Sequence, residues 1–324
     1  MPTFQFPRKY LLLTFSTFTY IIGLSQVTEQ WVRTYDGLGK GEHAPNTVAV
    51  DGSGNVYVTG YSWGGSSTDY DYATIKYDSA GTEVWTRRYN GPAGDNDFPL
   101  SLAVDGSGNV YVTGYVAGGT SIDYATIKYD TNGNELWVRF YNGTEDGDDV
   151  AQMVVVDALG NVYVTGNSDG GPATSYDYAT IKYDAAGNEL WITRYHGPIS
   201  GDFARSMAVD ALGNVYVTGN SFGEGGRDDY ATIKYDAAGK ELWVQRYNSP
   251  MNYSEVPSSL ALDGSGNVYV TGSSGVDGDN VYDYATIKYD TNGNERWVKR
   301  YNGPLSLDDF PRSLAIDASY LMVA

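Results

Sequence analysis

The octapeptide DYATIKYD occupies residues 71–78, and the same eight letters return four more times. The further copies are residues 123–130, 177–184, 229–236 and 283–290. A second motif, NVYVTG, recurs with almost the same spacing and begins at Asn55, Asn109, Asn161, Asn214 and Asn267. Self-similarity at a nearly constant period is the signature of a repeat architecture. We therefore interpret the chain as five copies of one structural unit.

Each unit contains four short apolar segments that are separated by turn residues. In the second unit they are SLAVD (101–105), NVYVTG (109–114), DYATIKYD (123–130) and NELWVRFY (134–141). Segments of this length that are rich in β-branched and aromatic residues and bounded by Gly, Asp and Asn indicate strands. Four strands in a period of about 53 residues are typical of a β-propeller blade. The fold class is therefore predicted as an all-β β-propeller with five complete blades and an incomplete or composite sixth.

The two ends of the repeat region predict how the propeller closes. Residues 30–35 (QWVRTY) match the fourth segment of a unit and predict an N-terminal outer strand, which would remove an exposed sheet edge. At the other end, a partial repeat covers 313–324, where SLAID is followed by ASYLMVA instead of NVYVTG. Two interpretations stay open: a truncated or frame-shifted end of a longer protein, or a composite sixth blade of three strands.

The segment 1–25 has the pattern of a secretory signal peptide. Arg8 and Lys9 precede an apolar run at 11–24, and the small residues Gly23 and Ser25 stand before Gln26. The run is too short to span a bilayer comfortably. We predict a cleaved signal at 1–25 and a propeller domain at 26–324, with an uncleaved anchor as the alternative. A secreted or cell-surface location follows from this prediction, without a membrane span in the mature chain.

Charge and cysteine content exclude several classes of function. The net charge is −19, and it becomes −21 once the two basic side chains of segment 1–25 are removed. A field of this sign repels nucleic acid and anionic lipid. The chain contains no cysteine, which excludes disulfides, thiolate zinc sites and cysteine nucleophiles. We expect a monomer whose partner is a neutral glycan, a protein or a cation.

The repeat resembles the bacterial β-propeller repeat known as SBBP. The resemblance is carried by DGSGNVYVTGYS (51–62) and DYATIKYDSAGTEVWTRRYNG (71–91), and it extends over residues 26–317. It implies a propeller fold in an exported, often cell-surface, bacterial protein. It implies no catalytic residues, so it informs the fold much more than the function.

One repeat position gathers acidic side chains. It lies eight positions before the aspartate that ends each innermost strand. The residues there are His43, Asp97, Asp149, Asp202, Glu255 and Asp309. If blade symmetry brings them around a channel mouth, they could bind a metal ion or a basic group, and mutual repulsion would raise their pKa values. The alternative is that each acid accepts hydrogen bonds from backbone amides at its own blade.

The loops between the second and third strands vary, while the short Asp/Gly turns hardly do. Variable loops on a fixed scaffold are where binding residues gather. The aromatic and charged side chains that are not shared between units are Trp63, Asp169, Phe222, Glu224 and Arg227. An exposed aromatic ring beside carboxylates suits the stacking of a sugar or the anchoring of a peptide. These side chains are the predicted ligand-binding set.

Other patterns favour scaffold over site. The octapeptide lysines are predicted to be structural, because their blades hold them too far apart to share a small ligand. The DTNGNE loops at 130–135 and 290–295 are interpreted as hairpin turns, with calcium as the alternative because carboxylate and amide oxygens alternate there. His196 replaces the Asn of the RYNG motif without a partner motif and is interpreted as neutral variation.

Three functions remain open on this sequence. We expect a non-catalytic binding module that engages a glycan or a protein through the variable loops. The alternatives are a carboxylate- and metal-dependent lyase or hydrolase on a propeller scaffold, and a structural spacer. No single unit carries a distinct catalytic constellation, which favours the binding module.

Overall fold

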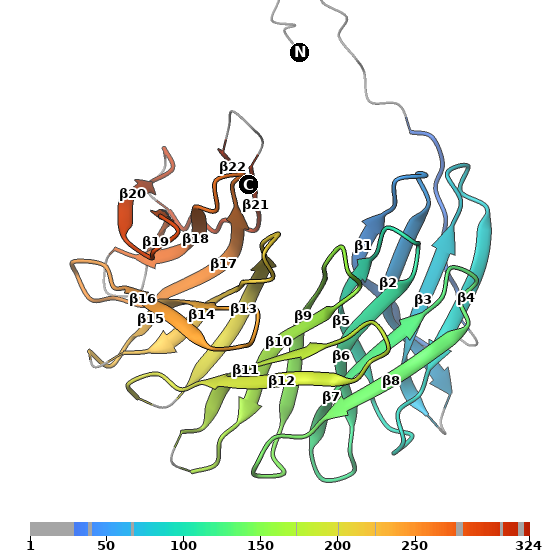
Figure 1. Cartoon of the computed structure of the whole chain (residues 1–324). Coiled ribbons are helices and arrows are strands. Elements are labelled where there is room, and N and C mark those ends of the chain that lie inside the picture. Colours follow the sequence, from blue (N-terminus) through green and yellow to red (C-terminus); the bar gives the residue numbers. More distant parts are fainter. Residues whose placement is uncertain are drawn as a thin grey trace, which may run out of the picture. The chain divides into compact units, whose positions relative to one another are not determined.

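The repeat unit folds as a four-stranded antiparallel sheet in which the strands follow one another in chain order (Figure 1). The computed structural model describes residues 29–37, 41–65, 68–172, 174–199, 201–223, 225–276, 281–304, 307–316 and 321–324. Contacts divide the chain into two units, Met1–Val32 and Arg33–Ala324, and all strands lie in the second. No helix in the described part of the chain is long and apolar enough to cross a membrane.

Five blades and one two-stranded sheet make up the fold of the described residues. Blade 1 consists of β1 (His43–Val50), β2 (Val56–Gly65), β3 (Asp69–Tyr77) and β4 (Glu83–Tyr89). Blade 2 consists of β5 (Phe98–Val104), β6 (Val110–Ala117), β7 (Ile122–Tyr129) and β8 (Glu135–Tyr141). Blade 3 consists of β9 (Asp149–Val156), β10 (Val162–Asp169), β11 (Tyr176–Tyr183) and β12 (Glu189–Tyr195). Blade 4 consists of β13 (Asp202–Val209), β14 (Val215–Phe222), β15 (Asp228–Tyr235) and β16 (Glu241–Tyr247). Blade 5 consists of β17 (Glu255–Leu262), β18 (Val268–Gly275), β19 (Tyr282–Tyr289) and β20 (Glu295–Tyr301). The short sheet pairs β21 (Leu314–Ile316) with β22 (Leu321–Val323).

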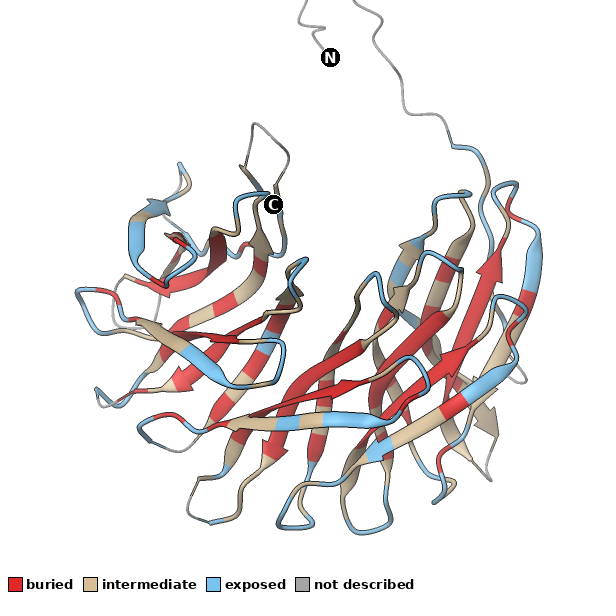
Figure 2. Cartoon of the chain, viewed as in Figure 1, coloured by how far each residue is buried: buried red, intermediate tan, exposed pale blue. Residues whose placement is uncertain are grey.

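The predicted fold class is confirmed, and so is the order of strands within a blade. First strands contact the first strands of neighbouring blades, as in β1 with β5 and β5 with β9, which makes them the innermost strands. The short strand β21 contacts β17 in the same way. Figure 2 shows that the second and third strands are the most buried, whereas the fourth strands carry many exposed residues.

The N-terminal segment differs from the prediction. Residues 29–37 contain no strand, although an outer strand was predicted at 30–35. A sequence suited to a strand does not by itself make one, because a strand also depends on pairing with a neighbour. Nevertheless, Arg33 Nε donates to the Gly81 carbonyl at 2.6 Å, as Arg87 Nε donates to Gly133. This part of the segment therefore makes the contact of an outer strand without pairing in a sheet.

The apolar cores lie between blades rather than within them. One cluster joins Tyr57, Tyr72 and Trp85 of blade 1 to residues of blade 2 such as Val112 and Ile127. Equivalent clusters join each of the next three pairs of blades. A blade thus buries its apolar surface only against its neighbour, which is the physical reason why such repeats need each other.

The octapeptide contacts the next blade through its first tyrosine and its lysine. In blade 2, Tyr124 Oη donates to the Ala179 carbonyl, and Lys128 Nζ donates to the Ala185 carbonyl at 2.8 Å. Thr126 Oγ1 lies 2.8 Å from Thr113 Oγ1 on the neighbouring strand. The lysine also lies over the Tyr111 ring, 5.1 Å from its centroid. These contacts agree with the structural interpretation of the octapeptide.

Hydrogen bonds within the short turns occupy the turn aspartates. Asp51 Oδ1 accepts hydrogen bonds from the backbone N–H groups of Ser53 and Asn55. Its Oδ2 accepts from the Asn55 side chain and from Tyr57 Oη. Gly54 adopts a φ of 79°, a conformation that glycine reaches without strain. The turns are therefore complete without an ion, and calcium binding by them stays a prediction.

Candidate functional site on the variable-loop face

A polar cluster recurs where the variable loops meet the strands. In blade 3, Arg194 Nη2 pairs with Asp177 Oδ2 at 2.8 Å, and Arg194 Nη1 donates to Ser168 Oγ and Tyr141 Oη. The tyrosine comes from the preceding blade. Blades 1 and 4 repeat the arrangement around Arg88 and Arg246. The cluster therefore joins blades 3 and 4 to the preceding blade, and joins blade 1 to Tyr35 of the N-terminal segment.

The predicted metal-ligand position lies at the start of each innermost strand. Asp97, Asp149, Asp202 and Glu255 there have an exposed fraction of 0%. Asp97 Oδ2 accepts a hydrogen bond from the N–H of Gly91, and Asp97 Oδ1 accepts from Ala117. Asp149, Asp202 and Asp309 accept from the equivalent glycines. Backbone amides at the blade entrance thus bind these acids, as the alternative interpretation expects.

Each acid at this position has an acidic neighbour from the preceding blade. Burial, together with repulsion from Asp71 and Asp95, raises the pKa of Asp97 to about 6. Burial, together with repulsion from Asp229, raises the pKa of Glu255 to about 7. The acids that perturb one another are therefore pairs at the blade junctions, and a metal ring formed by all six positions stays a prediction. Their burial keeps these carboxylates from direct contact with a substrate.

His43 takes the same position in blade 1. Its Nδ1 lies 2.8 Å from Ser62 Oγ, and its ring packs edge-on against Tyr35 at 5.8 Å. Here a histidine replaces the acid that would face the cluster around Arg88.

The predicted ligand-binding residues come from three blades: Trp63 from blade 1, Asp169 from blade 3, and Phe222 and Arg227 from blade 4. Trp63, Asp169 and Phe222 lie near the ends of β2, β10 and β14, at one and the same repeat position. Asp169 Oδ1 accepts a hydrogen bond from the Gly171 N–H within its own loop. Arg227 is exposed, and Glu224 lies outside the described residues. These residues belong to three different blades, and a common site for them stays a prediction.

An aromatic cluster surrounds Trp63, and the sequence analysis missed it. The aromatic cluster consists of Tyr61, Trp63, Tyr70, Phe98 and Tyr115, all of them partly exposed. Trp63 meets Tyr70 edge-on at 5.3 Å, Tyr61 meets both Tyr70 and Phe98, and Phe98 lies 5.4 Å from Tyr115. Tyr61 Oη donates to Glu42 Oε1 at 3.1 Å. The available signal was TGY at 59–61 and 113–115, where the other three units have TGN or TGS.

A cavity in blade 5 occupies the space that Tyr61 fills in blade 1. Its volume is about 340 Å³, and Val256, Ser258, Ser273, Tyr282, Phe310, Pro311 and Arg312 line it. Ser273 pairs with Val256 as Tyr61 pairs with Ala44. The Tyr282–Phe310 rings lie at 5.6 Å and 35°, close to the 5.8 Å and 36° of Tyr70–Phe98. Serine instead of tyrosine at one repeat position thus leaves a cavity with aromatic walls.

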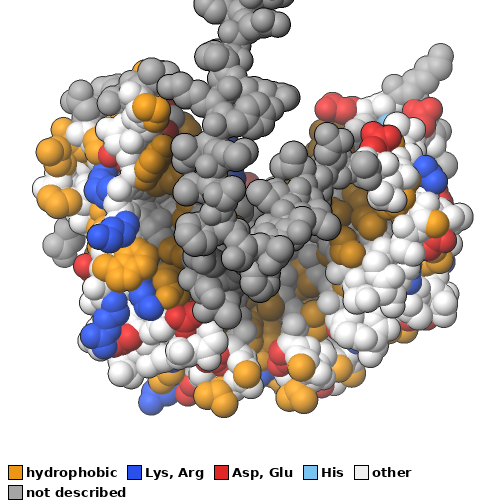
Figure 3. Space-filling model, turned by 90° about the horizontal axis from the view of Figure 1, so that it is seen from above, with side chains coloured by type: hydrophobic (Ala, Val, Ile, Leu, Met, Phe, Trp, Pro, Cys, Tyr) orange, Lys and Arg blue, Asp and Glu red, His pale blue; other side chains and the backbone are white. Residues whose placement is uncertain are grey.

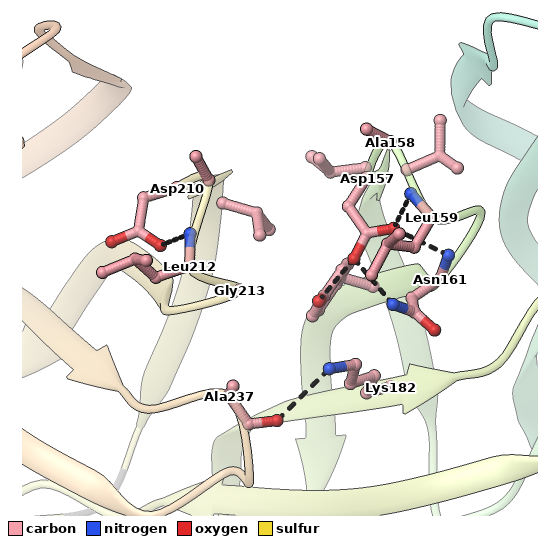
Figure 4. A pocket seen from close by; sticks show the side chains of 14 residues that line it. Asp157, Ala158, Leu159, Asn161, Lys182, Asp210, Leu212, Gly213 and Ala237 are labelled. Atoms are coloured by element: carbon pink, nitrogen blue, oxygen red, sulfur yellow. Dashed lines mark hydrogen bonds between the residues drawn. The ribbon is translucent and has the colours of Figure 1, made fainter.

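A second cavity lies on the opposite face, between the short turns of blades 3 and 4 (Figure 4). Its volume is about 480 Å³, and it lies beside Leu159 and Leu212, which are 83% and 80% exposed. Both leucines belong to DALGN turns, whereas the other three units have DGSGN. Lys182 in this cavity donates to the Ala237 carbonyl at 3.2 Å. The cavity is therefore mostly apolar, and its lysine is engaged in joining the two blades.

Charged side chains of both signs are mixed with apolar ones on the face seen from above (Figure 3). The chain is nevertheless strongly acidic as a whole. On the variable-loop face, the arrangement offers aromatic rings, a carboxylate at Glu42 and a small cavity beside Arg312. These groups can stack on a ring and exchange hydrogen bonds with hydroxyl groups.

Comparisons with known proteins agree with this architecture. The family model described as the SBBP β-propeller repeat matches residues 44–66, 84–125, 190–225 and 243–279. The regulatory protein FlaEY of Caulobacter vibrioides is 30% identical over 194 residues, which are 51% of this chain and 19% of that protein. An uncharacterized WD repeat-containing protein of Acanthamoeba polyphaga mimivirus is 23% identical over 79% of this chain and 22% of its own length. The chain thus spans about a fifth of the length of these two curated relatives.

Solved structures support the fold alone, because their sequence identities are low. The periplasmic gluconolactonase of Pseudomonas aeruginosa superposes with a TM-score of 0.55 at 14% identity, covering 86% of this chain and 77% of that one. An ulvan lyase of polysaccharide lyase family PL25 gives a TM-score of 0.52 at 14% identity, covering 87% and 74%. The β-propeller domain of the trilobed protease from Pyrococcus furiosus gives 0.51 at 9% identity, covering 87% and 78%.

The sequence motif, the blade topology and the matched regions lead to one assignment. Four regions of this chain match the SBBP β-propeller repeat, and its four-stranded sheets are the blades of a β-propeller.

Proposed function

We propose that this chain is a non-catalytic binding module that holds a carbohydrate against the aromatic cluster of its variable-loop face. The observation that carries the proposal is the cluster itself. Five partly exposed rings from two adjacent blades lie together, with the exposed carboxylate of Glu42 at their edge. Rings of this kind have an apolar face that packs on the C–H groups of a sugar and, in Tyr and Trp, a polar atom for hydrogen bonding.

Burial of the junction acids supports a binding role over the enzymatic alternative. A general acid or base must lie within hydrogen-bond reach of the group it protonates or deprotonates. Asp97, Asp149, Asp202 and Glu255 have no exposed surface and bind backbone amides or hydroxyl groups. A lyase or hydrolase built on these four carboxylates would need the blade junctions to open. We place the module outside the cytoplasm, because residues 1–25 have the signal pattern.

The test compares sugar binding by matched variants. A glycan array followed by calorimetry on the best glycan is expected to show that Trp63→Ala and Tyr70→Ala each weaken binding at least tenfold. Stacking on one aromatic ring is worth about 1–2 kcal/mol, and the two rings pack on each other. Leu212→Ala on the opposite face is the control and should bind as the parent does. Equal affinities for all four proteins would contradict the proposal, and a hit on a peptide array alone would point to a protein ligand.

The blade 5 cavity provides an independent arm of the same test. Ser273→Tyr installs the residue that blades 1 and 2 carry at this position, so the substitution suits the fold. If the cavity binds part of the ligand, the variant should lose affinity at unchanged stability. If only the aromatic cluster binds, Ser273→Tyr should leave the affinity intact.

A further inference from the structure

His196 lies beside two buried aspartates at the junction of blades 3 and 4. Its Nδ1 is 3.6 Å from Asp177 Oδ1 and 3.9 Å from Asp202 Oδ2. One donor atom from each of the three side chains can be chosen so that all lie within 4.8 Å of one another. Sequence reasoning interpreted His196 as neutral variation because no partner motif accompanies it. Its two partners in the structure lie on β11 and β13, which belong to different blades.

Asp177 presents an unused oxygen to this cluster. The residue is 5% exposed, and among the described residues its Oδ1 accepts no hydrogen bond. That oxygen is the one that faces His196. Leaving a buried carboxylate oxygen without a hydrogen bond is costly. The oxygen is therefore available to a cation.

Hydrogen bonds from neighbouring residues fix the orientation of the two carboxylates. Arg194 donates two hydrogen bonds to Asp177 Oδ2, and the Gly197 N–H donates to Asp202 Oδ2. Contacts of this kind fix the orientation of ligating carboxylates. Two donor atoms that each lie about 2.1 Å from a tetrahedral metal are about 3.4 Å apart. The distances from His196 Nδ1 to Asp177 Oδ1 and to Asp202 Oδ2, 3.6 Å and 3.9 Å, are close to this value. The His196 side chain is 47% exposed and leaves one side of the cluster open to solvent.

We propose that Asp177, His196 and Asp202 bind one divalent transition-metal ion, with Zn²⁺ as its representative. One imidazole nitrogen and two carboxylate oxygens are donors that Zn²⁺ uses, whereas Ca²⁺ and Mg²⁺ prefer oxygen donors alone. The four other units have Asn in the place of His196. The site therefore belongs to one junction, and its ion would join the outer strand of blade 3 to the inner strand of blade 4.

The experiment uses the two histidines of the chain as each other's control. Zn²⁺ is titrated by calorimetry into the full chain, purified without a histidine tag. The parent and His43→Asn should bind one equivalent and gain thermal stability. His196→Asn should lose at least 90% of the affinity, and its fold should be intact because Asn is the residue of the other units. Ca²⁺ should not distinguish the three proteins.

A gain-of-site variant sharpens the test. Asn90 corresponds to His196 at the junction of blades 1 and 2, where Asp71 Oδ1 also lacks a hydrogen bond and Asp97 faces it. Asn90→His should therefore raise the stoichiometry to two equivalents of Zn²⁺. The proposal is overturned if the parent binds no Zn²⁺, if His196→Asn binds as the parent does, or if Asn90→His adds no equivalent.

Discussion

At the scale of single residues, blade 2 differs from the other blades because it lacks two members of the polar cluster. Val116 and Phe140 stand where the other blades have the serine and the arginine of the polar cluster. Asp123 remains, its Oδ1 accepts no hydrogen bond from the described residues, and burial raises its pKa. Blade 2 thus keeps the aspartate but lacks the arginine that pairs with it in blades 1, 3 and 4.

The first prediction concerns the arginine of this cluster. Arg246→Met should lower the free energy of unfolding by about 2 kcal/mol, because it leaves the buried Asp229 without its cation. The value lies below the usual cost of breaking a buried ion pair, since the Arg246 side chain keeps 24% of its surface exposed. Phe140→Met at the same position of blade 2 is the control and should cost less than about 1 kcal/mol. Urea unfolding measures both, and equal losses would show that the ion pair contributes nothing.

At the scale of elements, the third strand joins one blade to the next through its lysine. Lys182 leaves β11 and donates to the Ala237 carbonyl, which belongs to the second short turn of blade 4. Trp191 Nε1 donates to the same carbonyl at 3.1 Å. Two donors from adjacent strands therefore hold a turn that its own blade would leave at the surface.

The second prediction follows from this contact. Lys182→Met keeps the apolar stem but removes the hydrogen bond and the charge over the Tyr163 ring, which lies 5.0 Å away. The free energy of unfolding should fall by about 1–2 kcal/mol, and the rate of amide hydrogen exchange should rise selectively in turn 236–240. Lys240→Met, at an exposed position of the same turn, serves as the control. Unchanged exchange in the turn would mean that the tryptophan alone secures it.

The elements also show how far sequence can lead. The period, the four strands of a blade, their order and the two short turns could be predicted, because each follows from local residue types. Contacts between blades could not, because they join positions whose distance depends on how two sheets pack. The pairing of Asp177 with Asp202 and the aromatic cluster are of this second kind. The strand expected at 30–35 is not present in the structure, because a suitable sequence does not by itself decide how a segment pairs.

At the scale of the whole molecule, the acidic residues fall into two classes with opposite pH dependence. Hydrogen bonds from Asn294 are the main cause that lowers the pKa of the turn residue Asp290 to about 2. Burial raises the pKa of Asp97 to about 6 and that of Glu255 to about 7. Groups of the first class contribute stability above their ordinary pKa of 3.8 and lose it as the pH falls towards 2. Groups of the second class contribute stability below their ordinary pKa and lose it as the pH rises through the raised value.

Unfolding free energy should therefore be highest near about pH 4 and fall on both sides. Glu255 is the sharpest probe of the alkaline side. Its carboxylate faces Asp229 together with Ser249 and Ser274, and the cations nearby, Arg246 and Arg300, are already bound to Asp229 and Ser274. These groups do not favour ionisation enough to offset burial. The folded state is therefore more stable when the Glu255 carboxyl is protonated.

Glu255→Gln should accordingly be more stable than the parent at pH 8, by on the order of 1–3 kcal/mol, because glutamine never ionises. Below pH 4.5, the ordinary pKa of this group, the parent carboxyl is protonated in both the folded and unfolded states, and the advantage should vanish. Urea unfolding followed by tryptophan fluorescence at pH 4 and pH 8 measures the difference. Glu241→Gln, at an exposed position of β16, should show no such dependence. A Glu255→Gln variant that gains nothing at pH 8 would mean that this junction already accommodates the charge, and the alkaline loss of stability would then have to come from other acids.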